Sequence, residues 1–376
     1  MHLRPVLDRP AGGKWRFDGF VGERLKAAVE SWLLPAPRAN PSMLQMFRDR
    51  DRKPTRKLVP WAGEFVGKHL TASVLVWEVT RDPRLFEATK GLVRELISVQ
   101  DADGYLGPHP RSERLVGKTV EGHRLWDVWG HYHGIVGLLL WHGQTKDEAA
   151  LQAARKAGDL ICRTFLDANR PLTDAGAEEM NMAIIHAMCL LYERTGEARY
   201  LQMAQRVEKD WELPSAGDYL RAGLAGTEFH LTRKPRWESL HDLLALPELY
   251  WITGDGRYRQ AFEHFWWSIL KGDRHNTGGF TSGEQAVGNP YATGAIETCC
   301  TVAWIAMSVE MLRMTGDPRV ADEIELSTLN GAIGGQHPCG RWWTYNTPMD
   351  GVKLASAHEI VFQAHPGGPE LNCCSV

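Results

Sequence analysis

The amino-acid sequence predicts an all-α fold, an (α/α)6 toroid in which helical hairpins pair into a closed ring. A short turn phrase recurs five times, apolar runs long enough for helices flank every copy, and long loops separate the resulting pairs. An open superhelix of helical repeats is the main alternative. The units differ in length, however, and long loops such as residues 99–124 and 211–236 are where functional sites usually lie.

The recurring phrase is a helix–turn–helix signal. It reads EVTRDPRLFEA, GQTKDEAALQAA, ERTGEARYLQMA, WITGDGRYRQAF and RMTGDPRVADEI, with threonines 50 to 65 residues apart. A Gly or Arg ends one helix, and an Asp or Glu favours the start of the next through its capping oxygen and its charge. Such hairpins cannot bury their apolar faces alone. Five visible copies and an expected sixth therefore predict a ring whose inner helices carry polar and aromatic residues.

The sequence changes character near residue 336. Residues 1–335 carry the helical pattern and are predicted to form one domain, whereas residues 336–376 are rich in Gly, Pro and aromatic residues with little helical period. We expect loops and short strands in this second segment, which carries a pair of adjacent cysteines almost at its end. We also expect it to lead into a further domain that this sequence lacks.

Composition excludes several functional classes. Of the 376 residues, 43% are apolar and 24% are charged, as in ordinary globular proteins, and the net charge is −3. This charge gives no long-range attraction to nucleic acid or to an anionic membrane, so we expect neither as a partner. The N-terminal residues hold no apolar run of signal-peptide length, and no stretch approaches a membrane span, so we expect a cytoplasmic protein. The oligomeric state is not predicted.

Two pairs of adjacent cysteines, in AIETCC and in ELNCCSV, form the first candidate site. Adjacent cysteines rarely bridge each other, because the ring that they would close strains the peptide between them. In a reducing compartment, thiols beside a carboxylate are typical of metal ligands or catalytic groups. Glu297, Cys299, Cys373 and Cys374 together make a plausible four-coordinate set for Zn²⁺.

The alternative for any cysteine is that it is a buried, small apolar residue. We expect this of Cys300, beside Cys299, and of the isolated Cys162, Cys189 and Cys339.

A carboxylate and several ring residues add to the candidate site. Glu284 lies in the Gly-rich stretch GGFTSGEQAVGNPY, where a side chain can approach a ligand closely, although a solvated loop glutamate is the simpler interpretation. His131 and His133 follow Trp129 near the start of an apolar helix, and on a helix they point in different directions. His241 has a similar position in WESLHDLL. A lone helix histidine is more often a partly buried residue with its hydrogen bonds satisfied.

These motifs resemble glycoside hydrolase family 127, the β-L-arabinofuranosidases and their relatives. The resemblance is carried by SGEQ, ETCC and NCCSV, with PWAGEFVGKHL, QDADGYLG and WDVWGHYHGI, and it covers nearly the whole chain. It implies that residues 1–335 form a catalytic domain and that the β-sandwich part of the family is absent here. It also implies a retaining glycosidase acting on an oligosaccharide, in which a zinc-bound cysteine thiolate replaces the usual carboxylate nucleophile.

The resemblance implies roles for individual residues. Glu297, Cys299, Cys373 and Cys374 match the zinc ligands, and Cys373 also matches the nucleophile. Glu284 matches the general acid/base.

Three further residues are expected to bind substrate. His131 matches a pocket histidine of the family, His241 has a weaker match, and Trp129 offers an aromatic face to a sugar ring. The segment between Glu284 and Glu297 is shorter than in better-known members. No clear counterpart of another pocket histidine stands near EEMNMAIIH, where Asn181 or His186 could replace it. The expected sugar is therefore β-L-arabinofuranose or a related plant-polysaccharide sugar, such as the aceric acid of pectin.

Two other functions stay open at this point. A sugar epimerase or an unsaturated-uronide hydrolase on the same scaffold would place His or Asp pairs at the toroid centre and would need no cysteines. A non-catalytic toroid would instead use the cysteines as a structural zinc clip for the C-terminal segment, with the aromatic residues as a carbohydrate-binding surface.

Overall fold

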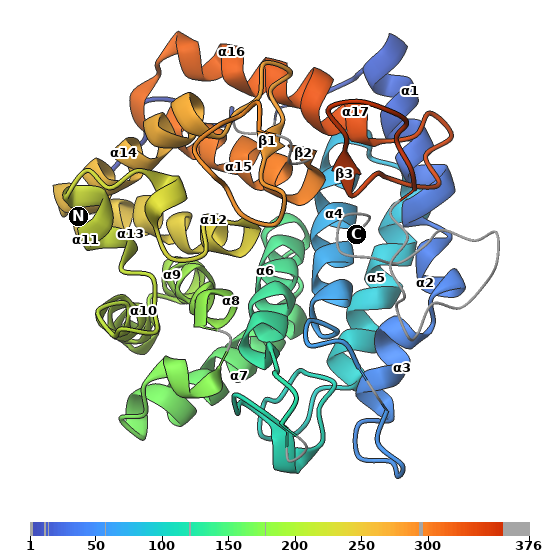
Figure 1. The fold of residues 1–376 in the computed structure, drawn as a ribbon. Coiled ribbons are helices and arrows are strands. Elements are labelled where there is room, and N and C mark those ends of the chain that lie inside the picture. The colour runs from blue at the N-terminus through green and yellow to red at the C-terminus, as the bar shows by residue number, and fades with distance from the viewer. Residues whose placement is uncertain are drawn as a thin grey trace. The chain divides into compact units, whose positions relative to one another are not determined.

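Figure 1 shows the computed structural model, which describes residues 3–10, 13, 15–56, 58–119, 122–176, 178–292 and 296–355. The chain folds as two compact units. The N-terminal unit contains residues 15–210 and 338–342, and the C-terminal unit contains residues 3–13, 211–337 and 343–355.

Helices dominate the described part of the N-terminal unit. Its α-helices are α1 (Gly19–Ala28), α2 (Ala36–Ala39), α3 (Ser42–Arg48), α4 (Glu64–Thr80), α5 (Pro83–Ser98), α6 (Asp127–Thr145), α7 (Glu148–Ile161), α8 (Glu178–Met182), α9 (Ile184–Thr195) and α10 (Ala198–Asp210). Two π-helical turns, η1 (Val29–Leu33) and η3 (Cys162–Asp167), and two 3-10 turns, η2 (Arg111–Glu113) and η4 (Leu172–Ala175), complete it.

The helices of this unit form hairpins with an inner and an outer member. Helices α4, α6 and α9 are buried on most of their surface, whereas α5, α7 and α10 bury one face and expose a charged one. Helix α6 packs between α4 and α9, and α5 and α7 pack outside (Figure 1). The backbones of α4 and α6 approach closely at Gly67, where a Cβ atom would lie 2.3 Å from the carbonyl carbon of His133. This approach brings the N-terminal ends of the two inner helices together.

The C-terminal unit repeats the hairpin pattern and adds a small sheet. Its helices are α11 (Tyr219–Leu224), α12 (Trp237–Leu243), α13 (Ala245–Thr253), α14 (Gly256–Gly272), α15 (Thr298–Thr315), α16 (Pro318–Leu326) and α17 (Ile333–Gly335), with the turns η5 (Phe229–Leu231) and η6 (Ser327–Ala332). Helix α14 packs on α11, α13 and α15, and α12 packs on α15.

Three short strands form an antiparallel sheet in the order β1-β2-β3 (Figure 1). They are β1 (Phe280–Thr281), β2 (Ile296–Glu297) and β3 (Asn346–Thr347). Glu297 of the central strand pairs with Phe280 on one side and with Asn346 on the other. Because β2 runs directly into α15, the sheet holds the start of that helix.

All five copies of the repeated phrase form the same turn. At the second copy, the Thr145 hydroxyl donates to the Trp141 carbonyl at 2.8 Å and accepts from the Asp147 N–H, and Asp147 caps the next helix through the Ala149 N–H at 3.1 Å. Lys146 between them is left-handed, with φ 60°. The residue after threonine is left-handed in every copy: Arg81, Lys146, Gly196, Gly254 and Gly316. The predicted hairpin turns are therefore confirmed.

The structure describes the C-terminal segment only as far as residue 355. Residues 336–355 contain β3 and an isolated bridge between Gln336 and Trp343. Cys373 and Cys374 lie outside the described residues, and the predicted domain boundary at residue 335 stays a prediction. In the described ranges, no helix is both long and apolar enough to cross a membrane.

Candidate active site

The start of α15 presents two of the predicted ligands. Glu297 is the last residue before the helix and Cys299 lies in its first turn, and both are buried, with 2% and 6% of their surface exposed. Neighbouring backbone groups fix the segment. The Thr298 N–H donates to the Tyr345 carbonyl at 3.0 Å, and the Thr301 hydroxyl donates to the Glu297 carbonyl at 2.8 Å. The carboxyl and thiol groups therefore lie on a rigid element.

The Ser282 hydroxyl joins this helix start to the loop that carries Glu284. It donates a hydrogen bond to the Glu297 carboxylate and accepts one from the Glu284 N–H at 3.2 Å. The Ser282 carbonyl also accepts from the Gln285 N–H at 2.8 Å. The Ser282 hydroxyl therefore links the backbone of the predicted acid/base to the carboxylate of the predicted ligand Glu297.

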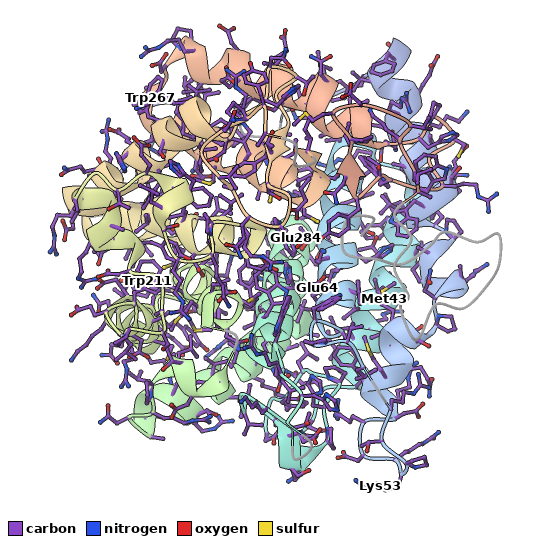
Figure 2. All side chains as sticks on the ribbon, viewed as in Figure 1. Met43, Lys53, Glu64, Trp211, Trp267 and Glu284 are labelled. Atoms are coloured by element: carbon purple, nitrogen blue, oxygen red, sulfur yellow. The ribbon has the colours of Figure 1, made fainter. Side chains whose placement is uncertain are left out.

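Glu284, labelled in Figure 2, has an unusual backbone conformation. Its φ of 75° lies in the left-handed region, which is unfavourable for a residue with a side chain and persists only where the surroundings hold it. Its side chain is 53% exposed, and Arg236 forms an ion pair with its carboxylate at 3.3 Å. The side chain therefore projects from a constrained loop.

Arg236 stands between two carboxylates. Its Nε and Nη2 atoms bind the buried Glu238 at 2.5 and 3.1 Å, and Nη2 also reaches Glu284. Burial by itself lowers the pKa of Arg236, but the charges of Glu238 and Glu284 outweigh it and raise that pKa above its usual range. The guanidinium is therefore a permanent positive charge beside the proposed acid/base.

Glu297 and Cys299 have the chemistry of a partial zinc site. Zn²⁺ is commonly bound by thiolate and carboxylate groups, and here one of each lies buried at a single helix start. Residues 3–355, with the gaps given above, contain no group of three or more His, Cys, Asp or Glu that could hold a metal ion. The other two predicted ligands, Cys373 and Cys374, lie outside the described residues, so the four-ligand site stays a prediction.

Of the remaining thiols, three are buried and one is exposed. Cys162, Cys189 and Cys300 are buried, as expected. Burial raises the pKa of the Cys300 thiol, and the charges of Glu297 and Glu238 raise it further, which keeps this sulfur protonated. The expectation of burial is wrong for Cys339, because it lies in an exposed turn outside the helices.

His241 lies on α12, in the same unit as Glu284. Its ring meets the Trp237 ring edge-on, with centroids 5.0 Å apart. The residue is partly exposed, and its predicted contact with substrate stays a prediction.

Trp129 anchors a buried network in the N-terminal unit. Its indole N–H donates to the Glu64 carboxylate, which also binds the Lys68 ammonium at 3.2 Å, and its backbone N–H donates to the Asn181 side chain at 3.0 Å. Glu64 is labelled in Figure 2. The Trp129 ring stacks on Tyr132, with centroids 5.4 Å apart. Because the ring is completely buried, Trp129 holds helix starts together here, and its predicted sugar contact is not tested.

His131 is also completely buried. Its Nε2 accepts from the Leu106 N–H at 3.0 Å and its Nδ1–H donates to the Asp127 carbonyl at 2.9 Å, so backbone groups bind both ring nitrogens. These bonds tie α6 to the loop before it. The predicted role in substrate binding stays a prediction.

Asn181 and His186, the two possible replacements for a further pocket histidine, differ in their contacts. Besides receiving the Trp129 N–H, Asn181 donates to the Ala175 carbonyl at 3.1 Å. His186 lies 3.0 Å from the Tyr132 hydroxyl, and burial lowers its pKa to about 4, so its ring is neutral at physiological pH.

Sequence reasoning missed three residues at this site: Arg236, Glu238 and Ser282. Ser282 stands within the motif SGEQ, so its position was visible but its link to Glu297 was not. Arg236 and Glu238 precede His241 in PRWESLH, at the start of a helix, where the local sequence does not single them out. The pairing of Arg236 with Glu284 crosses 48 residues and has no local signal.

Comparison with known proteins shows the fold and the family. A curated non-reducing end β-L-arabinofuranosidase from Bifidobacterium longum subsp. longum is 26% identical in an alignment 324 positions long, which covers 74% of this chain and 48% of that protein. The chain therefore spans about half the length of the curated relative that it matches.

Solved structures agree with the predicted fold class. A GH127 β-L-arabinofuranosidase from Geobacillus stearothermophilus T6 superposes with a TM-score of 0.68 at 21% identity, covering 89% of this chain and 58% of that one. A cellobiose 2-epimerase from Bacillus thermoamylovorans B4167 superposes with a TM-score of 0.50 at 13% identity, covering 86% and 93%. The all-α, (α/α)6 toroid class is thus confirmed.

The family itself is shown by a match along almost the entire sequence. The model of the β-L-arabinofuranosidase GH127 catalytic domain matches residues 18–375. As its motifs predicted, the chain belongs to this family of glycoside hydrolase catalytic domains.

Proposed function

We propose that this chain is the catalytic part of a retaining glycosidase that releases a terminal β-L-arabinofuranose from an oligosaccharide. Family membership supports the reaction class, and the name of the B. longum relative supports the sugar. One observation in the structure favours it most: Ser282 joins the backbone of the half-exposed Glu284 to the buried carboxylate of Glu297, two residues before the buried Cys299.

Retention needs a nucleophile and a proton donor near the scissile bond. In the proposal, the Cys373 sulfur attacks the anomeric carbon while the Glu284 carboxyl gives its proton to the leaving oxygen. Glu284 then takes a proton from the water that breaks the carbon–sulfur bond, which restores the thiolate. Its exposed position leaves room for the leaving group and for that water.

Glu297, Cys299, Cys373 and Cys374 would hold one zinc ion. Bound there, zinc would lower the pKa of the thiol groups, so that they would be thiolates at neutral pH. Glu297 and Cys299 are buried at the α15 start, which would keep these two ligands in place.

Thiol dependence tests this function. We expect the wild-type chain to hydrolyse 4-nitrophenyl β-L-arabinofuranoside with retention, read by NMR of the product anomer, and to carry about one zinc per chain. Cys373→Ser should abolish turnover, whereas Cys339→Ser, at the exposed thiol, should leave it unchanged.

Turnover by Cys373→Ser at the wild-type rate would refute the assignment of Cys373 as the nucleophile. An active, reduced sample without zinc would refute the ligand set. Activity that survives alkylation and chelation, with epimerised rather than hydrolysed sugar, would favour the epimerase class instead.

A further inference from the structure

Arg236 connects the proposed acid/base to the interior of the C-terminal unit. It is the last residue before α12, and its side chain is 21% exposed. Glu238, in the first turn of that helix, is buried and binds the guanidinium through two of its nitrogens. Among the described residues, the ion-pair partner of the Glu284 carboxylate is this same guanidinium.

The two ends of this Glu238–Arg236–Glu284 chain differ in rigidity. Two hydrogen bonds to Glu238 fix the orientation of the guanidinium, as in other bidentate arginine–carboxylate pairs. Glu284 lies on the loop between β1 and β2 with more than half of its side chain exposed. A side chain of this exposure samples several rotamers unless a partner selects one.

We propose that Arg236 is a positioning residue, which selects the rotamer of Glu284 that faces the leaving-group oxygen. This inference rests on the proposed function, because it assumes that Glu284 is the acid/base. Arg236 needs no contact with substrate. Its effect passes through Nη2, the nitrogen that binds both carboxylates.

Loss of a positioning arginine affects alkyl and aryl glycosides differently, whereas loss of a merely structural arginine would not. Departure of an alkoxide needs the proton of Glu284, whereas departure of a nitrophenolate needs it little. Misplacing the acid should therefore slow the hydrolysis of an alkyl glycoside much more than that of an activated aryl glycoside. A loss of fold or of binding would slow both.

The test uses Arg236→Lys, which keeps a positive charge for Glu238 and removes the fork. For methyl β-L-arabinofuranoside we expect kcat/KM to fall by about 10- to 100-fold, and for the 4-nitrophenyl glycoside by less than about threefold. In a Glu284→Gln background, adding Arg236→Lys should cause no further loss on the methyl glycoside, because the group that it positions is gone.

Arg274→Lys is the matched control. Arg274 lies in the same unit, is 22% exposed, and pairs with Glu323 at 2.9 Å. Among the described residues it forms no hydrogen bond or ion pair with Glu284. Arg274→Lys should leave kcat/KM unchanged for both substrates. If thermal unfolding shows that Arg236→Lys is not folded, Glu238→Gln tests the same chain of contacts from its buried end. Glu238→Gln should show the same dependence of kcat/KM on the leaving group.

The outcomes separate the inference from the function on which it rests. Equal losses on both substrates, wild-type kinetics of Arg236→Lys, or additive losses in the double variant would overturn the positioning role while Glu284→Gln remains impaired. Wild-type hydrolysis of the methyl glycoside by Glu284→Gln would instead remove the acid/base assignment itself.

Discussion

The buried polar network at the helix starts of the N-terminal unit contrasts with the exposed loop carboxyl of Glu284 in the C-terminal unit. In the N-terminal unit, Glu64, Trp129, His131 and Asn181 are buried, and their polar atoms bind one another or the backbone of neighbouring loops. In the C-terminal unit, Glu284 is half exposed and held through one arginine.

Given the acid/base role proposed for Glu284, the difference separates residues that stabilise the fold from a residue that serves turnover. A buried network with satisfied hydrogen bonds specifies how helices and loops pack, and breaking it leaves a charge or a donor without its partner. A carboxyl that must exchange protons with substrate and water has to keep a free face. We therefore expect variants of the first group to lower stability and variants of the second to lower turnover.

The largest effect is expected at Glu284. Glu284→Gln removes the exchangeable proton and should lower kcat/KM for methyl β-L-arabinofuranoside by about 10²- to 10⁴-fold. Its melting temperature should match that of the wild type, because the side chain is exposed. Steady-state kinetics and differential scanning calorimetry measure the two effects, and a large drop in melting temperature would contradict the division between the units.

The counterpart in the N-terminal unit is Glu64. Glu64→Ala removes the buried carboxylate that binds both Lys68 and Trp129, and should lower the free energy of unfolding by about 3–5 kcal/mol. Urea unfolding followed by tryptophan fluorescence measures it. Exposed Glu95, which pairs with Arg48 on the surface, is the control, and its alanine variant should lose no more than about 1 kcal/mol.

Asp273 is a buried carboxyl that accepts a hydrogen bond from the Gly288 N–H at 3.1 Å. We expect its titration to make the stability of the C-terminal unit depend on pH. Burial raises its pKa from 3.8 to about 7, so between these values the folded chain keeps a proton that the unfolded chain loses. Its contribution therefore lowers the free energy of unfolding as pH rises from about 4 to 7, and that loss is complete above pH 7.

Asp273→Asn keeps the acceptor oxygen and removes this titration. From pH 5 to pH 8, we expect the variant to lose roughly 1–3 kcal/mol less free energy of unfolding than the wild type. Urea unfolding across that range is the measurement. Parallel pH profiles would show that Asp273 does not titrate as described.

The smallest effect is expected from removing a helix cap, and the loss in the free energy of unfolding should be the same in both units. Asp147 and Asp255 cap helices in two copies of the repeated turn, one in each unit. Each alanine substitution should lower the free energy of unfolding by about 0.5–2 kcal/mol through loss of the cap. Thermal and urea unfolding measure both. Values that differ greatly would show that the turn is not an equivalent part of the two units.

The repeated turn was predictable because all its determinants are local. Threonine, a left-handed residue and a capping carboxylate lie within three positions, and each contact joins residues close in sequence. The motifs with Glu284, Glu297 and Cys299 were equally visible in sequence, and the family that they indicated is confirmed.

By itself, the sequence determined the helical hairpins, the family and the set of candidate groups, since these depend on short patterns of polarity, capping and motif. Only the tertiary structure decided which groups are buried and which carboxylate meets which cation. His131 and Trp129 are buried in the core of one unit, and Arg236 lies between Glu238 and Glu284 in the other. Burial and long-range pairing depend on how distant segments pack, and no local pattern encodes that arrangement.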